Sequence, residues 1–301
     1  MGFQNVREFI EAAVDDGRTW ISTFRKALTA TATVTGQWFD YSYVGGNPIP
    51  NYYAAAPLEA AVLEAEKGII VPRMPTGAQQ WLHRWQVMSA AASATSTTNS
   101  NQVLMLLDYL LFYPFVDMDA AGEDQTLVQT SALPRYTSGV GVQMVCVAQA
   151  PTVGGGRFTI TYVDSDGNPQ TSPSLFCGAA QGAGSIVNAT GATGGLLPFV
   201  PLNAGVKGVR EVTSVNFSVA NGGLMAVVLV KPLLTQWLRE ESRRTTTGTL
   251  ESFGDVAEWE AVRQGPLVEI QDGAFLGILG QGSAGTLASS VLVGCLESVW
   301  S

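Results

Sequence analysis

The chain has 301 residues, of which 46% are hydrophobic and only 14% are charged, and it carries a formal net charge of −9. This length is sufficient for one large or two ordinary domains with a substantial core. No run of Lys or Arg is longer than Arg243–Arg244, and because nucleic-acid binding needs a concentrated basic face, DNA and RNA are unexpected partners.

The low charge also predicts how the surface is used. Soluble domains carry about 25% charged residues on average, so this chain has an unusually neutral surface. We expect much of that surface to be covered by copies of the chain or by a larger assembly. The alternative is a neutral Ser- and Thr-rich surface that stays monomeric.

Residues 1–30 are predicted to form a helical arm. Apolar residues follow the helical period from Phe3 to Val14, and Gly17 occurs where a helix would end. Trp20, Phe24 and Leu28 resume the period, which predicts a second short helix. The acidic start lacks the basic and apolar regions of a signal peptide, so we expect a protein that is made and retained in a cytosol.

Residues 31–234 are predicted to form the body. Turns at "GGNP" and "PRMPTG" divide its first part, "APLEAAVLEAEKG" favours a helix that stops at Gly68, and "GAQQWLHRWQVMSAAA" fits a helix or a strand. The most apolar run, Val103–Val116, is shorter than the roughly 20 residues that a bilayer requires. It also contains Asp108 and Pro114, so it is expected to be core.

The pattern from about residue 103 to 234 is that of β-strands. "GVGVQMVCVAQA", "RFTITYVD", "VREVTSVNFSV" and "GLMAVVLV" are rich in β-branched residues and are bounded by turn formers. "RFTITYVD" alternates as a strand with one wet face would, whereas "MAVVLV" predicts a strand covered on both faces. The fold class expected is mainly β, an antiparallel β-sandwich or jelly roll.

Residues 235–301 are predicted to add a helix and a β extension. "PLLTQWLREESRR" favours a short helix and "TTTGT" a loop. The apolar runs "GAFLGILG" and "LASSVLVGCLESVW" follow, and we expect them to be buried, either by completing the sheet or by packing into another subunit.

The loop "DSDGN" is the first candidate for chemistry. Asp164, Asp166 and Asn168 offer three oxygen ligands, but a calcium loop of the EF-hand type ends in a bidentate Glu about a dozen residues after its start. Here the chain has Leu175 and Phe176 at that point. Asp-Gly and Asn-Pro directly after a strand instead favour a hairpin turn.

The remaining candidates are isolated. His83 is the single histidine, so a three-histidine metal site is excluded, and no GxSxG motif accompanies it. The three cysteines, Cys146, Cys177 and Cys295, are far apart in the sequence and are interpreted as buried free thiols.

Two further motifs are also weak. Paired carboxylates occur at Asp117 and Asp119, at Glu240 and Glu241, and at Glu258 and Glu260, which leaves a glycosidase as an open but unsupported alternative. Gly280, Gly282 and Gly285 match GxGxxG, yet too little chain follows for a dinucleotide fold. We therefore predict no catalytic, cofactor or metal residues, and no enzyme activity.

Five separated blocks carry a resemblance. "GQWFDYSYVGGNPIPNYYAAAPL", "LLDYLLFYPFVDMD", "LPRYTSGVGVQMV", "PFVPLNAGVKGVREVTSV" and "GGLMAVVLVKPL" together cover roughly residues 37–233. The chain resembles a group of tailed-bacteriophage virion structural proteins. The resemblance implies a component of the virion that is assembled in the host bacterial cytoplasm, and it implies no catalytic residues.

The expected function is that of a capsid decoration or cement protein, which coats and stabilises a phage head. Its expected partners are further copies of itself, as a homo-oligomer and specifically a trimer, and the major capsid protein or other virion proteins. A tail or connector component is the alternative. A third hypothesis is a jelly roll that binds host carbohydrate, with the aromatic residues of "WFDYSY" and "NYY" as stacking faces.

Overall fold

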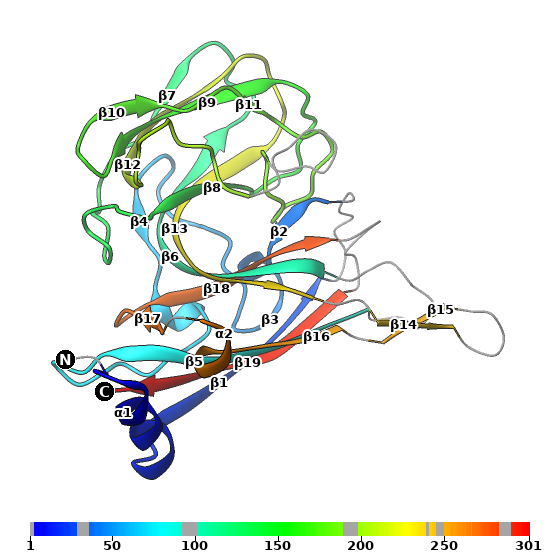
Figure 1. The fold of residues 1–301 in the computed structure, drawn as a ribbon. Coiled ribbons are helices and arrows are strands. Elements are labelled where there is room, and N and C mark those ends of the chain that lie inside the picture. The colour runs from blue at the N-terminus through cyan, green and yellow to red at the C-terminus, as the bar shows by residue number, and fades with distance from the viewer. Residues whose placement is uncertain are drawn as a thin grey trace.

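The body of the protein consists of three antiparallel sheets, which confirms the expected mainly β fold with a few short helices (Figure 1). A computed structural model describes residues 3–28, 36–91, 101–188, 198–238, 241–244, 250–253, 255–265, 267–282 and 290–301. The helical elements are α1 (Val6–Ile10), η1 (Glu11–Asp15), η2 (Tyr41–Tyr43), η3 (Ala65–Lys67) and α2 (Ala261–Gln264).

The lower sheet has the strand order β16-β5-β19-β1-β3, and β17 also pairs with β5. Its strands come from distant parts of the chain: β1 (Thr19–Leu28), β3 (Gly46–Asn47), β5 (Gln80–Ala91), β16 (Asp255–Glu260), β17 (Val268–Ile270) and β19 (Ser290–Trp300). The first and last long strands of the chain are therefore neighbours in one sheet.

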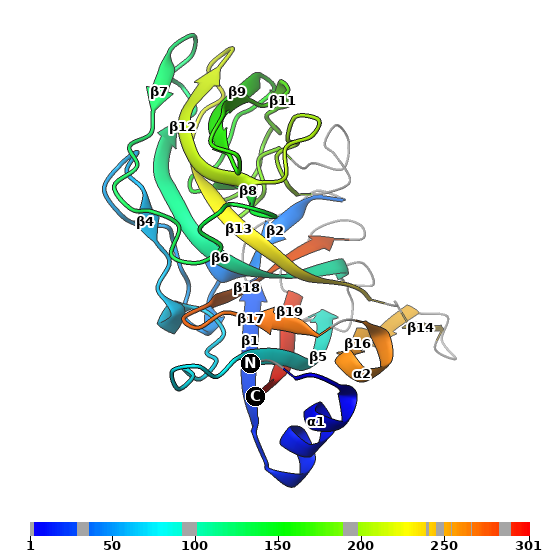
Figure 2. The same cartoon turned by 60° about the vertical axis from the view of Figure 1, so that its left-hand side comes forward.

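The central sheet has the order β2-β18-β6-β13-β8, and β4 also pairs with β6. Its strands are β2 (Trp38–Asp40), β4 (Ala61–Val62), β6 (Asn101–Asp117), β8 (Gln143–Ala148), β13 (Leu224–Trp237) and β18 (Phe275–Gly282). The longest pair, β6 and β13, runs through the middle of this sheet and curves from the lower to the upper part of the molecule (Figures 1 and 2).

The upper sheet has the order β10-β9-β12-β7, and β11 also pairs with β9. Its strands are β7 (Asp124–Thr126), β9 (Arg157–Asp164), β10 (Pro169–Thr171), β11 (Leu175–Phe176) and β12 (Val209–Phe217). A separate hairpin of β14 (Glu241–Arg244) and β15 (Leu250–Phe253) projects from the side of the molecule (Figure 1).

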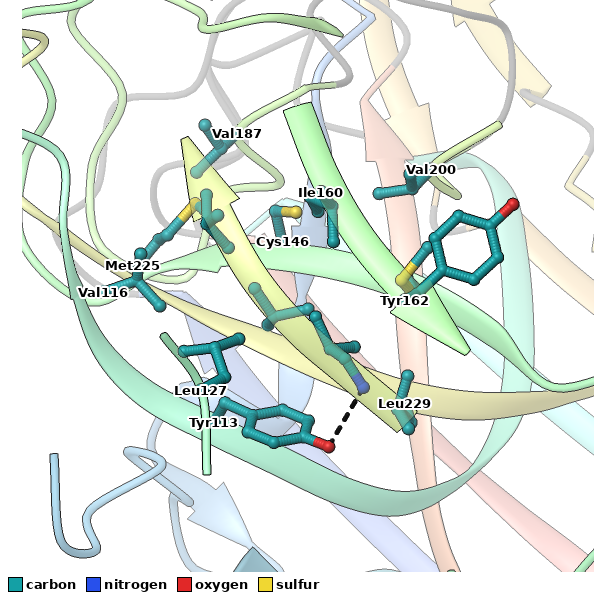
Figure 3. Close-up of a cluster of buried hydrophobic side chains, with 14 of the residues drawn as sticks. Tyr113, Val116, Leu127, Cys146, Ile160, Tyr162, Val187, Val200, Met225 and Leu229 are labelled. Atoms are coloured by element: carbon teal, nitrogen blue, oxygen red, sulfur yellow. Dashed lines mark hydrogen bonds between the residues drawn. The ribbon is translucent and has the colours of Figure 1, made fainter. Parts of the chain in front are cut away.

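The two ends of β6 reach different cores. Leu104 and Leu106 lie in the core between the central and lower sheets. Further along the same strand, Leu110 and Tyr113 lie in the core between the central and upper sheets, where the Tyr113 hydroxyl accepts a hydrogen bond from the Val212 N–H (Figure 3). The register shifts at Leu110, which leaves one extra residue in β6; a bulge of this kind bends a strand and increases its twist.

A buried ion pair lies on β6 between those two cores. The Arg135 guanidinium donates to both carboxylate oxygens of Asp108, at 2.8 and 2.7 Å, and also to the Tyr109 carbonyl at 3.0 Å. The Phe275 N–H donates to the same carboxylate at 3.1 Å. Burial raises the pKa of Asp108 to about 6, although Arg135 opposes the shift.

The other face of the central sheet carries a third core. Val103, Met105 and Leu107 from β6 lie there with Val228 of β13 and the ring of Tyr53 from a loop. The six residues Met225–Val230 of β13 are all buried. The prediction that "MAVVLV" is covered on both faces is confirmed, as is the alternation of β9, whose burial changes at every residue.

The second predicted helix of the N-terminal arm is wrong, because residues 19–28 form strand β1. The first helix is present: the Asn5 side chain accepts from the Glu8 N–H at 3.0 Å, and Gly17 adopts a left-handed conformation after the helical turns end. β1 then pairs with β19 along its whole length. The ring of Phe24 packs against Gly294, where any side chain would collide with it.

Two other helix predictions also fail. The stretch around Ala56–Gly68 forms the short strand β4 and the single turn η3, which does stop at Gly68. The stretch from Pro232 continues β13 to Trp237, and β14 follows at Glu241. The loop predicted at 245–249 and Gly285 of the glycine motif lie outside the described residues.

The apolar C-terminal runs complete sheets of the chain itself. "GAFLGILG" contributes β18 to the central sheet, and "LASSVLVGCLESVW" contributes β19 to the lower sheet. The sheets therefore join residues from the predicted arm (1–30), body (31–234) and extension (235–301). Of the two outcomes expected for these runs, the structure shows the completed sheet.

Removing Arg135 should be strongly destabilising, because Asp108 would remain buried without its partner. We expect Arg135→Met to lower the free energy of unfolding by about 3–5 kcal/mol, measured by urea denaturation. Arg18→Met is the control, since Arg18 and Asp16 form an exposed pair that should contribute below about 1 kcal/mol.

The double variant Asp108→Leu/Arg135→Met shows how much of the loss in stability comes from the unpaired charge and how much from lost packing. Replacing both members of a buried pair by apolar residues is often neutral, so most of the lost stability should return. A double variant as unstable as Arg135→Met alone would show that the ion pair itself holds the strands together.

Candidate functional site

The "DSDGN" loop is the turn of the β9–β10 hairpin, as predicted. The Asp164 carboxylate accepts hydrogen bonds from the backbone N–H groups of Asp166 and Asn168, both at 2.9 Å, and from the Gln170 amide at 3.1 Å. These hydrogen bonds lower the pKa of Asp164. The carboxylate thus closes the turn locally.

The other sequence candidates are not brought together. His83 lies 3.4 Å from the Glu297 carboxylate and its ring contacts Phe9. Asp117 and Asp119 accept hydrogen bonds from turn N–H groups. The side chains of Glu240 and Glu241 lie outside the described residues.

The cysteines are free thiols, as expected. Cys146 and Cys177 are buried in the core under the upper sheet, where burial raises the pKa of both, and Cys295 is half-buried on β19. Within the described part of the chain, no three His, Cys, Asp or Glu side chains are grouped as metal ligands.

The structure contains a buried polar network that the sequence did not indicate. Its centre is Asp40, whose carboxylate is fully buried and accepts hydrogen bonds from the hydroxyls of Tyr53, Tyr109 and Ser42 and from the Ser42 N–H. Burial raises the pKa of Asp40, and these hydrogen bonds oppose the shift. Carboxylate and hydroxyls satisfy one another within the core, as buried polar groups must.

Lys26 approaches this network from β1. Its ammonium donates to the carbonyls of Pro48 at 2.6 Å and Val44 at 3.3 Å. Burial lowers the pKa of Lys26 to about 8, while the negative charge of Asp40 opposes the shift. The cavity beside Lys26 has room for about one water, near 10 Å³, so this network has no space for a substrate. It ties β1, β2 and β6 together.

The outer face of the lower sheet is a better candidate for a functional surface. Ile21, Thr23 and Arg25 of β1 are exposed there and alternate with the buried Ser22, Phe24 and Lys26. Ile21 is 62% exposed and Met88 of β5 is 38% exposed.

This face also contains a shallow depression of about 610 Å³ over β5, β19 and β1. Its lining includes Gln86, Met88, Val293 and Cys295. We call this outer face of the lower sheet, with Ile21, Thr23, Arg25, Gln86, Met88, Val293 and Cys295, the open face.

Helix α1 covers one end of the same sheet. Phe9 and Ala12 pack on Val299 and Trp81, and α1 lies at the lower end of the sheet in Figures 1 and 2. The opposite side of the helical turns is exposed and apolar, with Val6, Ile10 and Val14. Apolar side chains therefore reach the surface on both the open face and the helix beside it.

The sequence contains the alternation of the open face in residues 19–28, but the helix predicted for these residues concealed it. In a strand, Ile21, Thr23 and Arg25 share one face, whereas the helical interpretation distributed them around a cylinder. The helical period of apolar residues from Phe3 to Val14 did predict the apolar side of the first helix. Its inner residues pack on the chain's own sheet, and its outer residues remain exposed.

No family model, no curated protein and no solved structure matches this chain. None of the described helices is long and apolar enough to cross a membrane.

The buried ammonium of Lys26 predicts a pH dependence of stability. Its pKa is about 8 in the folded chain and 10.5 when exposed, so the unfolded chain binds more protons between these values. The contribution of Lys26 to the free energy of unfolding should therefore rise between pH 8 and 10.5, by about 3 kcal/mol at most.

Lys26→Met removes this titration while keeping the length of the side chain. Over pH 8 to 10.5, wild-type stability should increase relative to that of Lys26→Met in denaturation curves. Parallel profiles of the two proteins would mean that Lys26 titrates normally in the folded state.

Proposed function

We propose that this protein is a non-enzymatic virion structural protein of a tailed bacteriophage, a capsid decoration or cement protein that coats the head through oligomeric contacts. The open face is the observation that carries the proposal. The resemblance of residues 37–233 to tailed-phage virion proteins supports the assignment to a virion.

The physical argument starts from the exposed apolar side chains. Burying a large apolar side chain contributes roughly 1.5–3 kcal/mol, and the open face with the adjacent helix offers Ile21, Met88, Val6, Ile10 and Val14. A sheet with one covered and one open face forms a broad, flat surface. Such a surface suits contact with a second protein surface of similar shape.

The charge distribution is compatible with self-association. On the open face, Arg84 lies 3.7 Å from Glu258 and 3.8 Å from Glu297, so several charges are already paired within the chain. Of the acidic groups on or next to the helical turns, Glu11 pairs with Arg7 and Asp16 pairs with Arg18. Glu8 and Asp15 have no ion pair among the described residues, and Arg25 is exposed on the sheet. An interface that joins the helix of one copy to the open face of another brings opposite charges together.

The oligomer proposed is a trimer, since three-fold positions suit proteins that coat icosahedral shells. Light scattering coupled to size exclusion should give about 95 kDa at micromolar concentration, three times the chain mass of 31.8 kDa. Ile21→Glu and Met88→Glu should reduce this to a single chain, because each places a charge inside the contact.

Val153→Glu is the matched control, since Val153 is 76% exposed in a loop away from the lower sheet. Circular dichroism should show an unchanged fold in all three variants. Val153→Glu should keep the trimer and the wild-type melting temperature, whereas the two monomeric variants should melt lower, because they lose the stabilisation that subunit binding gives the folded chain. A wild-type monomer, or trimers that persist in Ile21→Glu and Met88→Glu, would contradict self-assembly through the open face.

The virion assignment has its own test. Mass spectrometry of purified particles of the phage that encodes this chain should detect it in many copies per particle. Its absence from the particles would overturn the assignment, whatever the oligomeric state in solution.

A further inference from the structure

The lower sheet has one border at which a long strand is only partly paired. β1 pairs with β19 along its whole length, and on its other side, among the described strands, it pairs with β3 at Arg25 and Lys26 alone. We call residues 19–23 of β1 the free edge, because in the described part of the chain they have a strand on one side only. A strand in this position can accept a further strand through its main chain.

The hydrogen bonds near the two ends of β1 show which main-chain groups point to the free edge. The Ala27 N–H donates to the Gly45 carbonyl at 3.0 Å beside β3, whereas the Arg18 carbonyl accepts from the Trp300 N–H at 3.2 Å on the β19 side. Neighbouring residues of a strand direct these groups to opposite sides, and the pairing of β1 with β19 has no register shift. The odd-numbered residues of the free edge therefore direct their N–H and carbonyl groups away from β19.

The free edge lacks the residues that usually protect an edge strand. Its sequence, Thr-Trp-Ile-Ser-Thr, contains no charge and no Pro, and all but the Ser have a high β-propensity. Trp20 and Ile21 are both exposed. On the inner face of the sheet, the Ser22 hydroxyl donates to the Ile70 carbonyl, so the segment at Ile70 meets a side chain of β1 and not its main-chain edge.

The hairpin of β14 and β15 lacks a third strand. Glu241–Arg244 pair with Leu250–Phe253, and these two strands form a separate sheet with which no other described strand pairs. A hairpin of two strands is at best marginally stable in water, because it needs a third strand or a packed face for support. A further strand along β14 would supply that support.

The hairpin and the free edge lie at opposite borders of the lower sheet. β15 ends at Phe253 and β16 begins at Asp255, so the hairpin continues from the β16 border, while β1 lies toward the other border beside the short β3. In Figure 1 the hairpin projects beyond one end of the sheet, and the start of β1 lies at the other end, near α1. Sites at opposite borders of one chain can join successive copies head to tail in a closed ring.

The charges favour an antiparallel addition of β14, whose sequence is Glu-Ser-Arg-Arg. In an antiparallel pair, Glu241 would come near the end of the free edge that precedes Arg25. Arg243 and Arg244 would come near the other end, which follows Asp15 and Asp16. A parallel pair would instead bring like charges together at both ends.

We propose that β14 of one copy adds as an antiparallel strand to residues 19–23 of β1 in the next copy around the trimer. The inference rests on the self-association proposed above and names the segment of the second copy that binds. The added strand pairs with the main-chain groups of the free edge and extends the lower sheet of one copy with the hairpin of another. Because each copy provides one hairpin and one free edge, the ring closes with every such edge paired.

Cross-linking within the full chain tests which segments meet. Thr23→Cys is combined with Ser242→Cys in a Cys295→Ser background, because Cys295 is the one cysteine that is not buried, and a bis-maleimide then bridges neighbouring thiols. A second pair uses Arg243→Cys in place of Ser242→Cys, since adjacent residues of a strand face opposite sides. At least one pair should give covalent dimers and trimers on a denaturing gel, with no larger product, whereas each single-cysteine variant should stay a single chain.

A proline at the free edge tests the main-chain contact. Thr23→Pro removes an N–H that points to the free edge, and edge strands tolerate Pro where the N–H faces solvent. It should weaken trimer formation by about tenfold or more, measured by light scattering over a dilution series. Thr23→Ala is the matched control, since it also removes the side chain but keeps the N–H, and it should associate as the wild type does.

The outcomes separate this inference from the proposed self-association. A wild-type trimer with no cross-link in either double-cysteine variant, or equal association of Thr23→Pro and Thr23→Ala, would overturn the strand addition and leave the trimer standing. Cross-linking of Thr23→Cys alone would show that two β1 strands pair with each other instead. A monomeric wild type would contradict both proposals. Circular dichroism verifies the fold of each variant, and if Thr23→Pro does not fold, the cross-links decide.

Discussion

The pairing of β6 with β13 is the constraint on which the rest of the structure depends. These two strands pass through both sandwiches, so each must present apolar residues to a different partner layer at its two ends. The extra residue at Leu110 and the register shifts along the pair accommodate the bend. Asp108, with Arg135 bound to it, occupies the point where β6 leaves one core and enters the next.

The same constraint accounts for two carboxylates in the interior. The carboxylates of Asp40 and Asp108 are buried among partners within the chain, with Tyr53 and Tyr109 around the first and Arg135 on the second. Their hydrogen bonds connect strands and loops that are far apart in the sequence. Such groups specify how the layers join, and the cavity beside Lys26 at the first of them has room for about one water.

On the surface, the open face of the lower sheet is the region proposed to bind a partner. The open face carries aliphatic side chains on a flat sheet, which suits a protein partner. Glu258 of β16 lies on this face as well, since its carboxylate accepts from the Gln86 amide.

The sequence by itself determined the β class, the alternation of β9, the doubly covered run of β13 and the hairpin turn at Asp164, because these depend on neighbours a few residues away. It could not determine the element type of residues 19–28. Trp20, Phe24 and Leu28 are four apart, a spacing that places them on one face of a helix and equally of a strand, and the inward-facing polar Ser22 and Lys26 concealed the alternation. Only the tertiary structure decided this, because β19, nearly 270 residues later, supplies the hydrogen bonds that make β1 a strand. It likewise decided that Trp38, Tyr41 and Tyr53 are core and Trp237 is exposed, since burial depends on which distant layers meet.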